Sequence, residues 1–312
     1  MEIFSLVGKE VKQLASLKDI DKTKQTWIRV LDMNEDLLTE LSSFATIPLD
    51  EFKEFFEYEE HSRLEQGRFL ELVYQAPFTE KGEITTSPVN MFIINNLFIT
   101  VEKEKNASLE KISSFLKTKK LKFLFKQSIG EFLYYFLDKI NDQFLTTIDK
   151  IANLADILES REGDVSTQQL MKLYNYNVTL THFNQAIMAN VEVLIGLKKS
   201  YFKKFTKDDL ELFSDLYYDK LHILDTEKIQ REVISNLFNF QTVVSTHKLN
   251  HFMKRLTSLA LVIMVPTFIT SLFGMNVKLP FAGSEYGFFI LLGIMIVIAL
   301  FLLLIFKLTD WI

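Results

Sequence analysis

The chain contains 312 residues, of which 48% are hydrophobic, and its formal charge is −5 because 40 acidic residues outnumber 35 basic ones. The absence of cysteine excludes disulfides, thiolate metal sites and cysteine nucleophiles, and the acidic balance argues against nucleic-acid binding. No glycine-rich phosphate loop and no H-E-x-x-H metal motif occurs, so the sequence indicates a protein that is not an enzyme.

Residues 1–125 are predicted to form an α/β layer. Short segments with alternating apolar residues or high strand propensity are expected to be strands, with helical patterns between them. The expected strands are 26–31, 69–76 and a hairpin over 88–104, and the expected helices are 35–45 and 48–60. We place the hairpin turn at Asn95 and Asn96, because asparagine tolerates the positive φ of a tight turn.

Residues 126–255 are predicted to be helical. The segment 131–158 is amphipathic and reads as one long helix. Ser166 and Gln169 form a capping box, which begins a second helix that runs to about Lys199.

A much longer helix is expected after these two. Thr206 and Asp209 mark its start, and the sequence has neither glycine nor proline from Leu197 to Val265. A helix from Lys207 to Phe273 would be about 100 Å long at 1.5 Å per residue. It would carry the soluble part of the chain directly into a membrane.

The C-terminal part of the sequence is nearly free of charge after Arg255. Residues 256–273 hold no charged side chain, and residues 288–306 hold no polar one. Each run is about as long as a helix that crosses the bilayer core. We therefore expect two membrane-spanning helices, joined by an external loop over 274–287 and followed by a tail over 307–312.

The flanks of the two spans predict their orientation. Lys248, Lys254 and Arg255 precede the first span, and Lys307 follows the second. The positive-inside rule then places both termini in the cytoplasm and the loop outside. We expect a multi-pass protein of the plasma membrane, from a bacterium.

One face of the first span differs from the rest of that helix. At about 100° per residue, its members are small, polar or thioether residues, with Leu256 as the exception. They are Asn250, Met253, Leu256, Thr257, Ala260, Met264, Thr267, Ser271 and Gly274. This stripe would line a central path in an oligomer, with the second span outside; the alternative is close helix packing through small residues.

Two acidic patches could bind a divalent cation such as Mg²⁺ or Ca²⁺ through oxygen ligands. One is the segment 50–60, and the other is a face of the long helix with Asp208, Glu211, Asp215, Asp219 and His222. Like charges at these spacings repel one another, so water or a cation must separate them. Each patch is also consistent with an ordinary solvated surface. His247 and His251 form an i, i+4 pair that could bind a metal, and they too are consistent with ordinary surface residues.

The residues around the end of the first span carry a family resemblance. Gly274, Met275 and Asn276 stand between the two spans, with Pro266 and Thr267 upstream. With the pattern Asn250-x-x-Met253-x-x-Leu256-Thr257, the segment TWIRVL and residues 47–74, this arrangement resembles the CorA family of magnesium (and cobalt) transport proteins. The resemblance covers nearly the whole chain.

The resemblance implies an α+β cytoplasmic domain joined by a very long helix to a two-helix membrane hairpin, assembled as a homopentameric channel. Gly274, Met275 and Asn276 would form the selectivity filter for hydrated Mg²⁺, whose influx is driven by the membrane potential. Met253, Leu256 and Met264 would be apolar constrictions, and Asn250 and Thr267 polar stations. No organic cofactor is expected.

The family also has cytoplasmic regulatory sites between subunits, whose occupation by Mg²⁺ favours the closed state. Asp215 matches the long-helix member of that site, and the partner carboxylate falls near Glu54, where the match requires an offset of one residue. Asp208, Glu211 and Asp219 lie on the same face as Asp215 and are assigned to the same regulatory site.

Three features depart from the family pattern. Phe273 stands where tyrosine commonly precedes the tripeptide, Lys278 and Glu285 replace a more acidic loop, and the tail has one lysine, Lys307, in place of a basic cluster. Two alternatives stay open: transport of Co²⁺, Ni²⁺ or Zn²⁺ by the same fold, and a non-conducting membrane scaffold. Met275 argues against a protein devoted to zinc.

Overall fold

The computed structural model describes residues 1–8, 10–31, 34–57, 61–80, 82–118, 120–159, 166–276, 285–309 and 311. The chain divides into two compact units, Met1–Leu237 and Phe238–Ile312. Helix α6 (Lys207–Phe273) contributes to both, because its sequence runs across the division at residue 237.

The first unit is built on a seven-stranded sheet with the strand order β2-β1-β3-β7-β6-β5-β4. The strands are β1 (Glu2–Val7), β2 (Glu10–Leu14), β3 (Thr26–Val30), β4 (Arg63–Gln66), β5 (Leu70–Glu80), β6 (Glu83–Ile94) and β7 (Leu97–Glu102). Neighbouring strands are antiparallel except β3 and β7, which are parallel. Asn95 has a φ of 54° between β6 and β7, which confirms the predicted hairpin turn.

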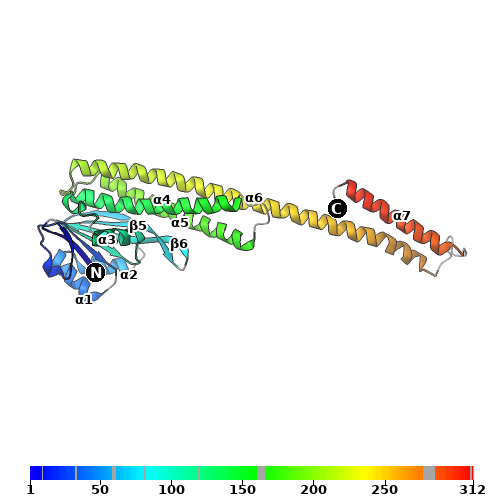
Figure 1. Ribbon diagram of the computed structural model, residues 1–312, viewed down its shortest axis with the longest axis horizontal. Helices are drawn as coiled ribbons and strands as arrows, with labels where there is room; N and C mark the ends of the chain where they lie inside the picture. The colour runs from blue at the N-terminus through cyan, green and yellow to red at the C-terminus, as the bar shows by residue number, and fades with distance from the viewer. Residues whose placement is uncertain are drawn as a thin grey trace. The chain divides into compact units, whose positions relative to one another are not determined.

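Helices cover both faces of this sheet (Figure 1). Helices α1 (Glu35–Ala45) and α2 (Leu49–Glu57) pack on one face; α3 (Ala107–Lys117), α4 (Ile129–Glu159), α5 (Thr167–Lys198) and the first part of α6 pack on the other. Two single 3₁₀ turns, η1 (Leu17–Asp19) and η2 (Leu124–Lys126), lie in the connections. Side chains of a strand alternate between its two faces, so Leu72 and Tyr74 enter one core and Val73 the other.

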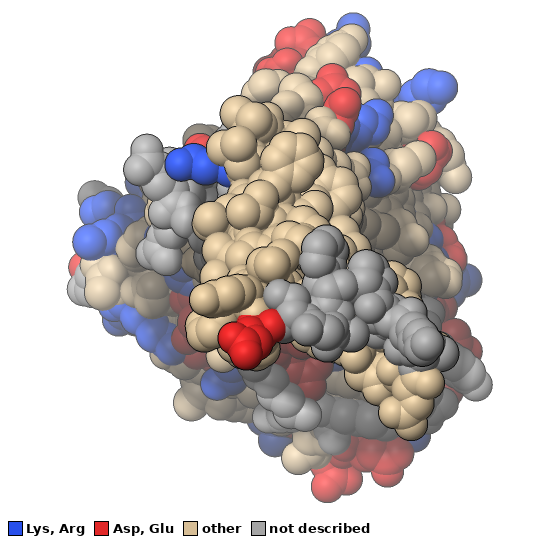
Figure 2. Space-filling model, turned by 90° about the vertical axis from the view of Figure 1, so that its right-hand side faces the viewer, with Lys and Arg blue, Asp and Glu red and all other residues tan. Residues whose placement is uncertain are grey.

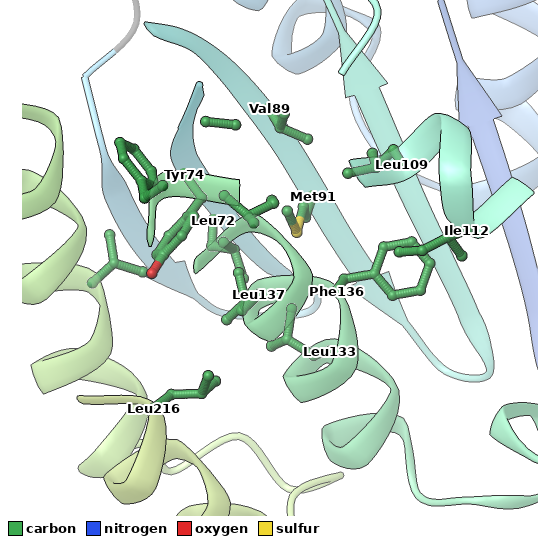
Figure 3. Close-up of a cluster of buried hydrophobic side chains, with 14 of the residues drawn as sticks. Leu72, Tyr74, Val89, Met91, Leu109, Ile112, Leu133, Phe136, Leu137 and Leu216 are labelled. Atoms are coloured by element: carbon green, nitrogen blue, oxygen red, sulfur yellow. The ribbon is translucent and has the colours of Figure 1, made fainter. Parts of the chain in front are cut away.

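The larger core joins the sheet to the long helices. Leu72 and Met91 from the sheet meet Leu133 and Phe136 of α4, with Leu216 of α6 beside them (Figure 3). Because the sheet and helices α4 to α6 share this core, the first unit includes all of the predicted segment 1–125 and most of 126–255.

The helix starts agree with the capping signals in the sequence. Ser166 accepts a hydrogen bond from the backbone N–H of Gln169, whose side chain accepts one from Ser166, so the predicted capping box is confirmed. Thr206 and Asp209 exchange the same pair of bonds at 2.7 and 3.2 Å where α6 begins. The predicted helix over 48–60 corresponds to α2 as far as Glu57, and residues 58–60 lie outside the described residues.

The second unit contains the rest of α6 and helix α7 (Gly287–Leu308). Both helices are long and apolar enough to cross a membrane, as the spans predicted at 256–273 and 288–306 require. In Figure 2 the described surface nearest the viewer consists mostly of uncharged residues. Residues 277–284 of the predicted loop, including Lys278, lie outside the described residues.

Candidate pore face and cation-binding sites

One face of α6 in the second unit is partly buried, and α7 runs alongside this part of α6 (Figure 1). Ser258 is fully buried there, and its hydroxyl donates to the Lys254 carbonyl at 2.8 Å. The partly buried residues on the same side are Leu261, Val262, Val265, Pro266, Ile269 and Phe273. At 100° per residue these positions fall on one side of the helix.

The stripe of small and polar residues lies on the opposite side of α6. All nine of its members, from Asn250 to Gly274, are exposed to solvent in this single chain. Among them, Met253 is 49% exposed and Met264 is 58% exposed. The second helix therefore packs away from the stripe, and the stripe is open to other copies of the chain or to a water-filled path.

The hydroxyl of Thr267 on this stripe donates to the carbonyl of Ile263 at 2.8 Å. Its only hydrogen is thus used within the helix, which leaves the oxygen as an acceptor toward the outside. A hydrated cation presents water hydrogens, so an outward-facing acceptor suits its first shell of water.

Helix α6 ends at the tripeptide that the sequence singles out. The backbone N–H of Gly274 donates to the carbonyls of Thr270 at 3.0 Å and Ser271 at 3.2 Å, and that of Met275 donates to Leu272 at 3.3 Å. These bonds close the last turn. Asn276 follows it, is exposed, and has a carboxamide with no hydrogen-bond partner among the described residues.

The acidic face of α6 lies in the first unit and is exposed at all four carboxylates, Asp208, Glu211, Asp215 and Asp219. The opposite face of the same turns, with Phe213 and Leu216, is buried. Sequence reasoning missed a contributor from α4. Burial raises the pKa of Asp138, and the carboxylates of Asp142 and Asp219 raise it further, against the opposing effect of Lys139.

The structure does not bring Glu54 and Asp215 together within one chain. Glu54 is exposed on α2, which packs on one face of the sheet, whereas α6 packs on the other face. The described residues contain no group of three or more side chains able to hold a metal ion. A site that uses both carboxylates therefore needs a second copy of the chain.

A buried lysine on α6 was also missed. Lys220 is fully buried; its amine donates to the side-chain oxygen of Asn141 at 2.8 Å and lies 4.0 Å from the centre of the Phe144 ring. The Tyr74 hydroxyl donates to the same Asn141 oxygen at 3.0 Å. Burial lowers the pKa of Lys220 well below its ordinary value. Lys220 follows Leu216 by four residues, which places it on the buried face of α6. This spacing was the signal of its burial that the sequence offered.

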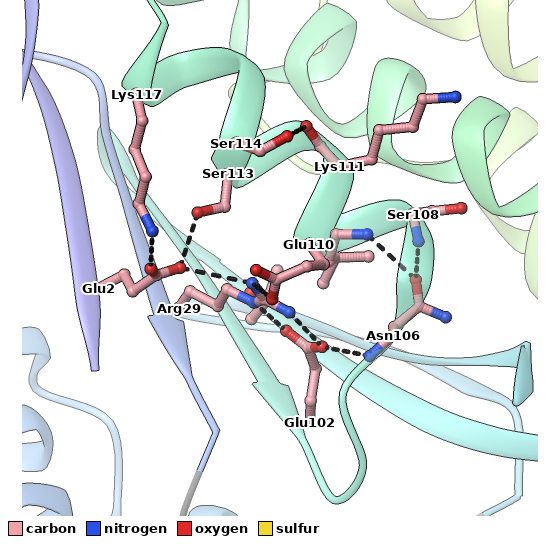
Figure 4. A network of polar contacts seen from close by, with 12 residues as sticks. Glu2, Arg29, Glu102, Asn106, Ser108, Glu110, Lys111, Ser113, Ser114 and Lys117 are labelled. Carbon is pink, nitrogen blue, oxygen red and sulfur yellow. Dashed lines mark hydrogen bonds and ion pairs between the residues drawn. The ribbon is translucent and has the colours of Figure 1, made fainter. Parts of the chain in front are cut away.

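A second buried charge, Arg29, stands in the middle of the strand TWIRV. Its guanidinium contacts Glu102 at 2.6 and 3.0 Å, Glu110 at 2.8 Å and Glu2 at 3.4 Å (Figure 4). Lys117 also pairs with Glu2 at 2.6 Å. The network ties β1, β3, β7 and α3 together, and each of its carboxylates pairs with a cationic side chain, which indicates a structural role.

Comparison with known proteins shows which family has this sequence and fold. Residues 22–308 match the family described as "CorA-like Mg²⁺ transporter protein". The cobalt/magnesium transport protein CorA of Methanocaldococcus jannaschii is 31% identical over 92% of this chain and 91% of its own length. That of Thermotoga maritima is 22% identical over 93% and 84%. The complete structure of the CorA magnesium transporter from M. jannaschii, 29% identical, superposes with a TM-score of 0.87 and covers 100% of this chain and 99% of that one.

Proposed function

The chain belongs to the CorA family and is a CorA-like Mg²⁺/Co²⁺ transport protein, and we propose that it acts as a homopentameric channel for Mg²⁺ influx. Five copies of α6 surround the path, and α7 stays on the outside. Both termini are cytoplasmic, in the plasma membrane of a bacterium. Residues 256–273 line the path, 274–287 form the external loop, 288–306 are the outer span and 307–312 are the tail.

The observation that carries this proposal is the position of the polar stripe. A helix that only anchors a protein in lipid has no use for exposed groups such as Thr257, Thr267 and Ser271 on one continuous face. That face is open in the single chain and lies opposite the side that packs on α7. One hairpin cannot enclose a path, so several copies must turn this face toward a common axis.

Ion selection follows from the chemistry of Mg²⁺, which sheds its water reluctantly. A ring of Asn276 carboxamides, with Met275 and the Gly274 carbonyls beside it, offers neutral acceptors and donors to a hydrated ion. A ring of carboxylates would hold the ion more tightly, whereas a conduit must also release it.

Closure involves two parts of the molecule. Met253, Leu256 and Met264 narrow the path with apolar side chains that exclude water when the helices approach. Cytoplasmic Mg²⁺ binds between Asp215 of one copy and Glu54 of its neighbour, close to Asp208, Glu211 and Asp219, and favours the closed arrangement. The exposure of all these carboxylates, and the sheet that separates Glu54 from Asp215 within one chain, support a site between copies.

Cobalt is a second candidate cargo, because the curated relatives are named cobalt/magnesium transport proteins. The residues inside the path offer mainly oxygen groups, together with the thioethers of Met253 and Met264. Hard oxygen ligands suit Mg²⁺ better than Ni²⁺ or Zn²⁺. A scaffold without transport would leave the exposed stripe without a role.

The decisive experiment is flux through purified protein in liposomes that contain a Mg²⁺-sensitive dye. We expect a protein-dependent signal that grows when the interior is made negative, and competition by external Co²⁺. A correctly assembled protein that passes no divalent cation would establish the scaffold alternative.

A further inference from the structure

A pocket of about 610 Å³ lies between α3 and α4 in the first unit. Its volume falls within the range of about 300–1,000 Å³ that is usual for small-molecule sites. Its lining residues belong to β5, α3 and α4, and none belongs to α6. The pocket therefore shares no residue with the stripe of α6 or with the acidic face of that helix.

The two helices run antiparallel along the pocket and give it two unlike ends. At one end Ser108, near the start of α3, lies against Gln143 of α4, with 2.8 Å between the hydroxyl and the side-chain oxygen. At the other end Phe115, near the end of α3, lines the pocket together with Tyr135, which comes earlier on α4. The lining residues of α4 beyond Gln143 bear hydroxyl or amine groups; they are Thr146, Thr147 and Lys150. The pocket is thus aromatic at one end and polar at the other.

The wall between the two ends is already held in place by hydrogen bonds. The hydroxyl of Ser108 lies 2.8 Å from the carbonyl oxygen of Lys139, and the amide nitrogen of Gln143 donates to the Pro77 carbonyl at 2.9 Å. Thr147 donates to the Gln143 carbonyl at 2.7 Å. A ligand would therefore find a formed pocket and would need to order few side chains on binding.

The charge of the lining favours an anion. Three of the lining residues are lysines and one, Asp142, is acidic. Asp142 is paired with Lys139 at 2.5 Å. Lys111 and Lys150 are exposed, and neither forms an ion pair with a carboxylate of the described residues. In Figure 4 the side chain of Lys111 extends away from the Arg29 network. Lysine amines with hydroxyl donors beside them are suited to phosphate oxygens.

We propose that this pocket binds a nucleoside polyphosphate, with the base against Phe115 and Tyr135 and the phosphates at Lys111 and Lys150. Bases of every kind stack on aromatic side chains. The positive end of the α3 dipole lies at the polar end of the pocket and adds to the attraction for phosphate. A free phosphate would leave the aromatic end empty, and an uncharged aromatic molecule would leave the two lysines without a partner. The proposal concerns binding and does not depend on ion transport.

The direct test is calorimetric titration of the full-length protein in detergent with ATP, in a buffer without divalent cations. Inorganic tripolyphosphate and adenosine are titrated in parallel, because each carries the chemistry of one end of the ligand. We expect saturable binding of one ATP per chain. Tripolyphosphate and adenosine should each bind at least tenfold less tightly than ATP.

Substitutions at the two ends should act on different probes. Lys111→Gln and Lys150→Gln should each weaken the binding of both ATP and tripolyphosphate about tenfold, as loss of a hydrogen bond to a charged group predicts. Phe115→Leu should weaken ATP binding about tenfold and leave tripolyphosphate binding unchanged. The matched control is Lys126→Gln, which removes an exposed positive charge of the same unit outside the pocket and should change ATP affinity less than twofold. Melting temperatures without ligand check that each variant is folded.

Four outcomes would overturn the proposal. Equal affinities for ATP and tripolyphosphate would assign the pocket to a free phosphate. Equal losses in Lys150→Gln and Lys126→Gln would mean long-range attraction alone. Wild-type ATP affinity in Lys111→Gln and Lys150→Gln would place ATP elsewhere on the protein. No saturable ATP binding by the assembled protein would mean that the pocket takes no nucleotide or that a neighbouring copy covers it.

Discussion

Asp209 of α6 lies directly against Gly130 of α4. A Cβ atom on Gly130 would lie far inside van der Waals contact with the Asp209 side chain. Asp209 is 1% exposed; its carboxylate accepts from the Thr206 N–H at 2.7 Å and from the Ser128 hydroxyl. Since Ser128 also caps α4 through the Glu131 N–H, one carboxylate fixes the starts of both helices.

Replacing Gly130 by alanine should therefore displace the start of α6. We expect Gly130→Ala to lower the free energy of unfolding of the first unit by about 1–3 kcal/mol, as overpacking usually does. Gly67→Ala is the control, because a Cβ there meets nothing within 4 Å. Thermal unfolding of the full-length protein measures both, and equal stability of the two variants would contradict the close approach.

Lys220 predicts a specific dependence of stability on pH. Because burial lowers its pKa in the folded state, the folded chain binds fewer protons than the unfolded chain, and stability should rise with pH toward the ordinary lysine range. We expect Lys220→Met to be more stable at pH 7 by roughly 1 kcal/mol or more. The difference in melting temperature from wild type should narrow between pH 7 and pH 9; a constant difference would mean that the amine does not titrate there.

Glu71 predicts the opposite dependence of stability on pH. Its carboxylate accepts from Asn90 and from Arg63, each at 2.8 Å, yet burial raises its pKa to about 7, with further contributions from Glu51 and Glu65. The folded chain then binds more protons than the unfolded chain between the ordinary glutamate value and about 7, so this contribution to stability is lost as pH rises through that window.

We therefore expect Glu71→Gln to weaken the decline in melting temperature between pH 5.5 and pH 8. Glu40→Gln, which changes an exposed carboxylate on α1, should leave the decline close to that of wild type. Identical profiles for Glu71→Gln and wild type would remove Glu71 as the titrating group.

Asn276→Ala tests the filter. Hydrogen bonds to charged groups contribute about 1.5–3 kcal/mol each, so loss of the carboxamide ring should reduce Mg²⁺ flux in liposomes at least about tenfold. Assembly should be unchanged by size-exclusion chromatography. Asn239→Ala, an exposed site on the same helix outside the stripe, should conduct normally. Wild-type flux in assembled Asn276→Ala would refute the assignment.

Asp215→Asn tests the cytoplasmic sensor. If Mg²⁺ binds the closed state more tightly, the variant should need more Mg²⁺ for protection of the first unit against proteolysis and should stay active at higher internal Mg²⁺. Glu54→Gln should act in the same direction, with less than additive effects in the double variant. Glu232→Gln, an exposed carboxylate elsewhere on α6, serves as control. If the Mg²⁺ dependence of protection against proteolysis is unchanged in Asp215→Asn, this acidic face is an ordinary solvated surface.

The parts of the fold that sequence predicted are those with a strong local signal. Helix α1 and the Asn95 turn follow from periodicity and turn chemistry alone. Strands β2 and β4 escaped prediction because they are short, polar and at the sheet edges, where few side chains are buried. Helix α3 was also missed, although Asn106 caps it with its side-chain oxygen.

The candidate sites were likewise predictable from the sequence only where the local signal is strong. The stripe of α6 was predictable because a lipid-facing helix does not need small and polar residues on one side. Lys220 and Arg29 were not, since a charged residue is expected at the surface until its tertiary partners are known. The proposed pairing of Glu54 with Asp215 would require a second copy of the chain, and a single sequence carries no direct signal for such a contact.

The sharing of one core between the sheet and α6 has a consequence for biosynthesis. Phe213, Leu216 and Leu237 complete the apolar cover of a sheet whose last strand ends at Glu102. At translation rates of about 5–20 residues per second, that face of the sheet stays uncovered for on the order of ten seconds before these α6 residues are synthesised. The first proposed membrane span starts at Leu256, shortly after Leu237. Protection of the open core by chaperones and delivery to the membrane must therefore act on the same nascent chain at nearly the same time.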